Sequence, residues 1–164
     1  MKNKFMQTIV GTLLGLLLLI GCAQIFVSGQ NNGNQENAIV GVYRTTVTQR
    51  NCQTGVPIAV FQGLSTFNQG GTMAETSTAL SPALRSPGHG VWRREARFQE
   101  YSFAFTFLRF SPDGTFIGTQ VIRQTAMLTP GDNEYKATGF IEVYNAGGNL
   151  LGTGCATSVA TRFE

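Results

Sequence analysis

The stretch Tyr101-Ser-Phe-Ala-Phe-Thr-Phe-Leu-Arg-Phe110 alternates apolar side chains with small or hydroxylic ones. One face of this stretch carries the aromatic side chains of Tyr101, Phe103, Phe105 and Phe107. Successive side chains of a β-strand point to opposite faces of a sheet, so the alternation predicts a strand with one buried, aromatic face.

The chain from residue 38 onward has the pattern of strands divided by tight turns. Gly, Pro, Asp and Asn gather at residues 68–71, 111–114, 130–133 and 145–149, and these residue types favour tight turns. The runs between the turns are rich in Thr, Val, Ile, Phe and Tyr. We predict eight strands, at residues 39–50, 56–68, 72–80, 90–96, 100–110, 115–128, 134–145 and 150–162.

Short connections between these strands favour sequential antiparallel pairing. We therefore predict an all-β fold, an eight-stranded antiparallel up-and-down β-barrel, because closure removes the exposed edges of an open sheet. A two-sheet β-sandwich is the alternative. The long break in the pattern is at residues 81–90, which contain two prolines.

Cys52 and Cys155 support the barrel. In a closed meander of eight strands, the first strand pairs antiparallel with the last, so the end of one lies beside the start of the other. Cys52 follows the first predicted strand and Cys155 lies early in the last. A Cys52–Cys155 disulfide would therefore fasten the seam, and an oxidising compartment favours it over two buried free thiols.

Residues 1–21 have the layout of an export signal, with Lys2 and Lys4 ahead of an apolar run at residues 9–20. The run is shorter than the roughly 20 residues of a membrane span and suits a signal peptide. Leu19-Ile20-Gly21-Cys22 resembles a bacterial lipobox, which implies that Cys22 is lipidated and becomes the new N-terminus. Cleavage after Ala23 and an uncut anchor are the alternatives. All three place the rest of the chain outside the cytoplasm, and lipidation places it in the cell envelope.

Residues 22–37 are predicted to be a flexible tether, since residues 28–37 are mostly Gly, Asn and Gln. Residues 38–164 then form a single β-barrel domain. Without residues 1–21 the chain has ten basic and nine acidic residues, so its net charge near +1 does not favour nucleic acid as a partner. The sequence has no phosphate-binding loop, dinucleotide fingerprint or Cys/His metal motif, so we predict no cofactor and no metal.

Gly41-Val42-Tyr43 and Arg162 together resemble the calycin signature, in which a Gly-x-Trp motif packs against an arginine of the last strand. Tyr43 stands where that family has tryptophan, and no helix pattern follows the last strand as it does in lipocalins. Residues 70–75, 88–92, 113–118 and 154–157 resemble stretches of small exported barrels related in shape to allene oxide cyclase. The resemblance implies a lipocalin-like barrel.

Glu75 and His89 are the candidate catalytic residues. His89, the sole histidine, lies between two glycines, and a loop residue at the start of a strand is its simpler interpretation. Glu75 lies in a predicted strand of mostly small or hydroxylic residues. If its face points inward, a carboxylate in an apolar barrel could act as an acid or a base; if outward, it is a solvated charge.

The candidate ligand-binding residues are the aromatic ones, together with Glu75: Trp92, Tyr101, Phe103, Phe105 and Phe107. Trp92 lies next to several arginines, which could hold an anionic head group. Alternatively, Trp92 fills the core and the arginines form a solvated outer face. The phenylalanines could line a pocket or simply fill the barrel, because eight-stranded interiors can be solid or hold one small ligand.

The sequence thus predicts a lipid-anchored extracytoplasmic barrel whose partners are the membrane, through the lipidated N-terminus, and a small apolar or amphipathic ligand. Two alternatives stay open. One is a barrel-cavity enzyme of the cyclase or isomerase type, in which Glu75 or His89 moves a proton. The other is a structural or interaction module with a filled core. Whether the interior is hollow decides among the three.

Overall fold

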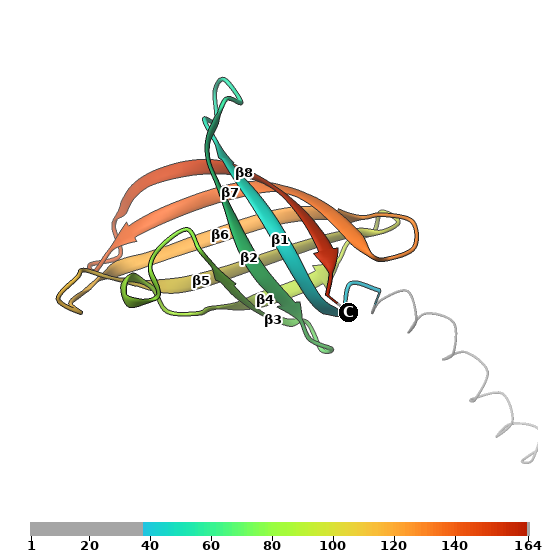
Figure 1. The fold of residues 1–164 in the computed structure, drawn as a ribbon, viewed down its shortest axis with the longest axis horizontal. Helices are drawn as coiled ribbons and strands as arrows, with labels where there is room; N and C mark the ends of the chain where they lie inside the picture. Colours follow the sequence, from blue (N-terminus) through green and yellow to red (C-terminus); the bar gives the residue numbers. More distant parts are fainter. Residues whose placement is uncertain (1–37, 164) are drawn as a thin grey trace, which may run out of the picture. The chain divides into compact units, whose positions relative to one another are not determined.

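A computed structural model describes residues 38–163, which form a closed barrel of eight antiparallel strands (Figure 1). The strands are β1 (Gly41–Arg50), β2 (Pro57–Phe67), β3 (Thr72–Ser77), β4 (Gly88–Arg94), β5 (Glu100–Phe110), β6 (Phe116–Leu128), β7 (Glu134–Asn145) and β8 (Leu150–Arg162). Each strand pairs with the next, and β8 pairs with β1. The predicted up-and-down barrel is confirmed, and the two-sheet sandwich is excluded. The predicted signal peptide, the tether and Cys22 lie outside the described residues.

The connection between β3 and β4 differs from the prediction. β3 ends at Ser77 rather than at residue 80, and β4 begins at Gly88 rather than at residue 90. The connecting residues 78–87 include a short 3₁₀ turn, η1 (Pro82–Leu84). The amide of Thr78 donates to the carbonyl of Gln62 as the last link to β2, and the chain then departs from the sheet. This loop brings Arg85 into the barrel.

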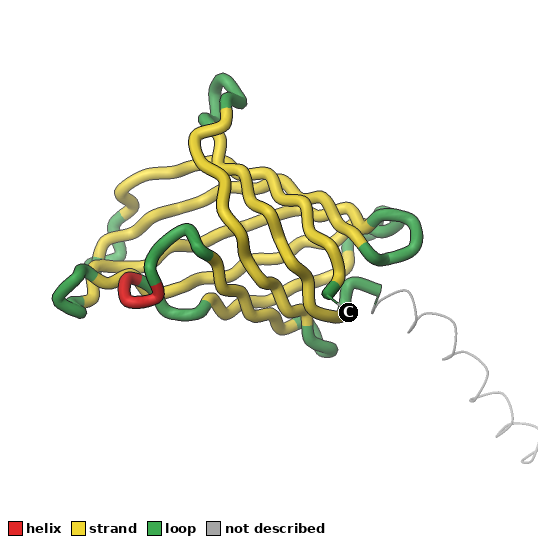
Figure 2. The backbone as a smooth tube through the Cα atoms, in the orientation of Figure 1, coloured by secondary structure: helices red, strands yellow, loops and turns green. Residues whose placement is uncertain are grey.

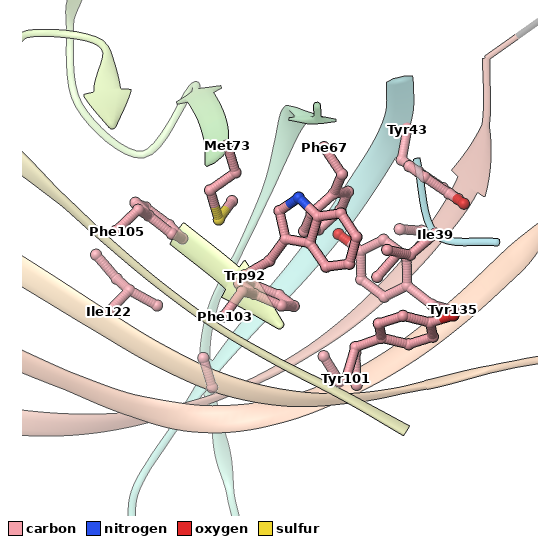
Figure 3. Close-up of a cluster of buried hydrophobic side chains, with 14 of the residues drawn as sticks. Ile39, Tyr43, Phe67, Met73, Trp92, Tyr101, Phe103, Phe105, Ile122 and Tyr135 are labelled. Atoms are coloured by element: carbon pink, nitrogen blue, oxygen red, sulfur yellow. The ribbon is translucent and has the colours of Figure 1, made fainter. Parts of the chain in front are cut away.

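Large hydrophobic side chains pack together inside the barrel (Figure 3), and one group of them fills the end that we call the closed end. The fully buried ones there include Ile39, Tyr43, Phe67, Tyr101 and Tyr135. Their rings meet edge to face, with ring centroids 5.8 Å apart for Tyr43 and Phe67 and 5.0 Å apart for Tyr43 and Tyr135. Such pairs stabilise a fold beyond the area they bury. We call this group the closed-end cluster.

Arg162 ties the N-terminal segment to the closed end. Its guanidinium lies 4.8 Å from the centre of the Tyr43 ring and donates to the carbonyls of Val40 at 2.6 Å and Ala38 at 2.7 Å. It also donates to the carbonyl of Asp132 in the β6–β7 turn. Gly41 has a φ of +146°, which L side chains rarely adopt, and a Cβ there would lie 2.2 Å from an Arg162 nitrogen, so this position needs glycine. The contact between residues 43 and 162 is the one that the calycin-like signature predicts.

The seam between β1 and β8 is fastened as predicted. Arg50 at the end of β1 is directly opposite Cys155 of β8, and Cys52 forms a disulfide with Cys155 across a Cα–Cα distance of 5.2 Å. Beyond Arg50 the β1–β2 hairpin leaves the barrel wall, and its loop of residues 51–56 projects from the barrel (Figure 2). The disulfide holds the base of this hairpin against β8.

Candidate functional site

The interior of the barrel is filled at the closed end, and we call the opposite end the mouth. Between the two lies a cavity of about 50 Å³. This volume is far below the roughly 300–1,000 Å³ of ordinary ligand pockets and suits about one or two water molecules. Its polar lining comes from Thr45, Ser65, Glu75, Ser77, Arg85, Gln120, Gln124, Tyr135 and Ser158.

Glu75 and Arg85 form an ion pair at this cavity. A terminal guanidinium nitrogen of Arg85 lies 2.5 Å from a carboxylate oxygen of Glu75, and the two side chains are 4% and 10% exposed. Arg85 also donates to the hydroxyl of Ser77 at 2.6 Å and to the carbonyl of Ser86 at 3.1 Å. Its guanidinium lies 3.9 Å from the centre of the Phe107 ring. Arg85 is therefore held on several sides, as a buried charge must be.

A second polar group lies deeper in the cavity. The hydroxyl of Thr45 is 3.4 Å from the hydroxyls of both Ser65 and Tyr135. Burial raises the pKa of Tyr135, although hydrogen bonds from Thr45 and Ser65 oppose the shift. Tyr135 is consequently protonated at neutral pH, and its hydroxyl can donate as well as accept a hydrogen bond.

The structure brings together four of the six residues predicted to contact a ligand. Phe103, Phe105, Phe107 and Glu75 line the cavity. Glu75 thus points inward, but toward the guanidinium of Arg85 rather than into an apolar barrel. A carboxylate that acts as an acid or a base was expected to lie in apolar surroundings. The ion pair departs from that expectation.

Trp92 does not line the cavity but packs on Phe67 and Tyr101 of the closed-end cluster, with 6.0 Å between the ring centroids of Trp92 and Tyr101. The indole nitrogen of Trp92 donates to the carbonyl of Asn68 at 2.9 Å, and its ring packs edge to face on Phe67. Arg93, the next residue, is exposed on the outer face. The arrangement is the one expected if Trp92 fills the core and the arginine next to it is solvated.

His89 and Glu75 are not brought together. His89 is exposed on β4, where it is opposite Ala74 and Thr106. Glu75 is opposite Gly88 and points to the other face of the sheet. Because the two side chains point to opposite faces of the sheet, they cannot form one acid–base pair.

Arg85 is the main site residue that the sequence does not predict. It lies in a loop, where no periodicity shows which way a side chain points. Thr45, Ser65, Gln124 and Ser158 are also buried polar residues of the interior. The alternation of β1, β2, β6 and β8 separates the side chains of each strand into two faces. It indicates which residues are buried only once the inward face of each strand is known.

No family model, no curated protein and no solved structure matches this chain. Within residues 38–163, no helix has the length and apolar character needed to cross a membrane. In the same residues, no three His, Cys, Asp or Glu side chains are grouped so that they could hold a metal ion.

Proposed function

We propose that this chain is an extracytoplasmic barrel, anchored in the membrane of a bacterial envelope through a lipidated Cys22, and that it binds a small amphipathic molecule at the mouth of the barrel. The signal-like N-terminus and the lipobox-like residues support the anchor. The polar side chains that line the cavity support the binding site, and the buried Arg85–Glu75 pair is the observation that carries it.

The small cavity favours the alternative of a module with a filled core, and the ion pair is the observation against it, because a purely structural core gains little from such a pair. Replacing a buried ion pair by apolar residues of similar volume is often neutral or stabilising, because desolvation of two charges is expensive. The structure instead places the pair beside the apolar surface of Phe105, Phe107 and Ile122. A few polar groups that converge on an apolar wall are typical of sites for small molecules.

The ligand that fits these surroundings has an anionic or hydroxylic head and a short apolar body. The head of the ligand would contact Arg85 and replace part of the contact between Arg85 and Glu75. The body of the ligand would lie on the phenylalanines. Because the cavity is about 50 Å³, the ligand must displace the loop of residues 78–87 that holds Arg85. Binding would therefore be coupled to movement of this loop.

Titration of the full chain in detergent with a fluorescent fatty acid tests the proposal. We expect binding that Arg85→Gln weakens by about tenfold, since it removes a charged hydrogen-bond donor. Ala79→Phe provides a second test that leaves the ion pair intact. It should also weaken binding, because Ala79 is exposed at the mouth and lines the cavity. Arg97→Gln, an exposed arginine away from the cavity, is the matched control. Absence of binding, or equal binding by all variants, would refute the site.

The anchor has its own test. Intact mass spectrometry of the protein made in a bacterial host should show the mass of a diacylglyceryl and an acyl group on a chain that begins at Cys22. Cys22→Ala should lack this mass and leave the membrane fraction. An unmodified chain cleaved after Ala23 would contradict lipidation and leave the binding proposal unaffected.

A further inference from the structure

A groove of about 820 Å³ crosses the outer face of the barrel. The pairing registers place its outward-facing strand residues in two neighbouring rows that run across the strands, and Asn51, Cys52 and Gly55 of the β1–β2 loop also line it. The first row consists of Arg50, Cys155, Phe140, Arg123, Ala104 and Val91. The second row consists of Thr157, Thr138, Thr125, Ser102 and Arg93. These residues alternate with buried ones such as Trp92 and Phe103, so they face outward.

The groove is long and narrow. Its first row spans six strands, from β1 to β4 by way of β8, and neighbouring strands are about 4.8 Å apart, so the row is about 24 Å long. The two rows are separated by two residues along each strand, which is about 7 Å. An extended chain fits this outline better than a compact molecule.

The second row presents a series of hydroxyl groups. Ser102, Thr125, Thr138 and Thr157 lie on four consecutive strands, β5 to β8, so one hydroxyl recurs about every 4.8 Å. The hydroxyl of Thr157 already accepts a hydrogen bond from the Nε of Arg50 at 3.0 Å, but a hydroxyl can donate as well as accept. The row therefore suits a ligand that also carries hydroxyl groups at regular intervals.

The charged side chains in the groove are all basic. Arg50, Arg93 and Arg123 line it, and no acidic residue does so within the described part of the chain. The Nε of Arg93 donates to Glu95 at 2.8 Å, and the Nε of Arg123 donates to Glu142 at 3.4 Å. Both glutamates lie outside the lining, and the contacts found in residues 38–163 leave the terminal nitrogens of these two arginines available to an anion.

Glu95 is the competing anion at one end of the groove. Its carboxylate accepts hydrogen bonds from Ser102 and Arg93. Both bonds lower the pKa of Glu95, and the bond from Ser102 has the larger effect. Glu95 therefore carries its charge at neutral pH and occupies one hydroxyl and one guanidinium of the groove. A ligand anion at this end would have to displace it.

The middle of the groove has an exposed aromatic ring. Phe140 is 64% exposed, whereas Ala137 and Ile141 on the inward face of β7 are buried. Gly139 lies beside it, and a Cβ there would be 2.0 Å from the carbonyl oxygen of Arg123, so only glycine allows β6 and β7 to approach this closely. The negatively polarised face of the ring suits the C–H groups of a sugar.

We propose that this groove binds an extended acidic oligosaccharide, with its acidic groups on Arg123 and Arg93, its hydroxyls on the threonine row and one sugar ring against Phe140. An acidic peptide fits less well. Peptides that bind sheets usually add a strand at an exposed edge. Strands β5 to β8 are each paired on both sides in the groove, so their backbones offer no such edge.

Isothermal titration calorimetry of the full chain in detergent tests this site. The probes are hexagalacturonate and a heparin hexasaccharide, with neutral maltohexaose and hexaglutamate as controls. We expect the acidic sugars to bind, the neutral sugar and the acidic peptide to bind at least about tenfold more weakly, and affinity for the acidic sugars to fall as salt is raised. Hexaglutamate binding as tightly as the sugars, or neither acidic sugar binding, would overturn the proposal.

Matched variants locate the site. Arg123→Gln should weaken binding of an acidic sugar by about tenfold, and Thr125→Val, which keeps the shape and removes one hydroxyl, by about threefold. Glu95→Gln should tighten binding, because it removes the competing carboxylate. Arg97→Gln is the control, since Arg97 is also exposed and paired with a glutamate but does not line the groove. A loss in Arg97→Gln equal to that in Arg123→Gln would show attraction by charge alone and refute the groove.

Discussion

Arg85 and Glu75 form an ion pair inside the barrel, with 2.5 Å between a guanidinium nitrogen and a carboxylate oxygen. Glu75 lies on β3, and Arg85 lies in the loop that follows it. The loop thus returns its arginine to the inner face of the strand that it has just left. The ion pair thus connects the loop at the mouth to the interior of the barrel. The coupling free energy between the two side chains can be measured.

Single substitutions of the pair should be costly. Glu75→Gln or Arg85→Gln leaves one buried charge without its partner, so we expect each to lower the free energy of unfolding by about 3–5 kcal/mol. Urea denaturation of both single variants and the double variant measures the coupling between the two side chains. The exposed pair Arg93–Glu95 is the control, and its cycle should give a much smaller coupling, because water and salt screen an exposed pair. A coupling for Glu75 and Arg85 as small as that would contradict a buried ion pair.

The disulfide should stabilise the seam by constraining the unfolded chain. It joins residues 103 positions apart, and loops of this length can contribute up to about 4.7 kcal/mol in the chain-entropy model. We expect the double variant Cys52→Ser, Cys155→Ser to lose about 2–4 kcal/mol in denaturant. Reduction of the wild-type protein should have the same effect and should leave the double variant unchanged. A response of the double variant to reductant would point to another cysteine.

Arg162→Lys should loosen the closed end of the barrel although it keeps the charge. A lysine has one nitrogen in place of the planar fork, so it cannot reach the carbonyls of Ala38, Val40 and Asp132 together. We expect a loss of about 2–3 kcal/mol and faster amide hydrogen exchange in the N-terminal segment. Unchanged exchange there would show that other contacts hold the segment.

Tyr43 should make stability depend on alkaline pH. Burial raises its pKa from 10.0 to about 12, the largest cause being desolvation, and the nearby Arg162 opposes the shift. Between these two values the folded state keeps a proton that the unfolded state has lost, so the free energy of unfolding falls as pH rises. The contribution of Tyr43 is fully present below pH 10 and is lost by about pH 12.

Tyr43→Phe tests this prediction. The buried hydroxyl of Tyr43 has no hydrogen-bond partner in the described residues, so its removal should leave stability at pH 7 unchanged or raise it by about 1 kcal/mol. Urea unfolding at pH 7 and again between pH 10 and 12 should then show a smaller alkaline loss in the variant. A marked loss at pH 7 would reveal a hydrogen bond to this hydroxyl.

Much of the fold could be predicted from local pattern. The alternation of β5 gives its inward aromatic face, and turns rich in Gly, Asp and Asn delimit β6, β7 and β8. The positions of Cys52 and Cys155 predicted the closing seam. The end of β3 was predicted three residues too late, because residues 78–80 continue a strand-like composition into a loop that is set by contacts with β2 and the mouth.

The site was less predictable. Phe103, Phe105 and Phe107 line the cavity as proposed from their alternation, and Glu75 points inward, one of two orientations that its sequence allowed. Trp92 packs instead on the closed-end cluster, because β4 reaches that end of the barrel before it turns. The sequence could not distinguish these positions along the barrel axis, since alternation specifies a face and not a depth.

By itself, the sequence determined the strand count and the antiparallel order, and it favoured the closed barrel over the sandwich and the disulfide over two free thiols, because these follow from side-chain alternation, turn residues and the position of two cysteines. The tertiary structure alone decided that Arg85 enters the interior, that the cavity is small, and that hydroxyls of four strands form one row on the outer face. These features depend on register between strands and on the path of a loop. A shift of one residue would turn every side chain of a strand to the opposite face, and only the packed barrel selects among the registers.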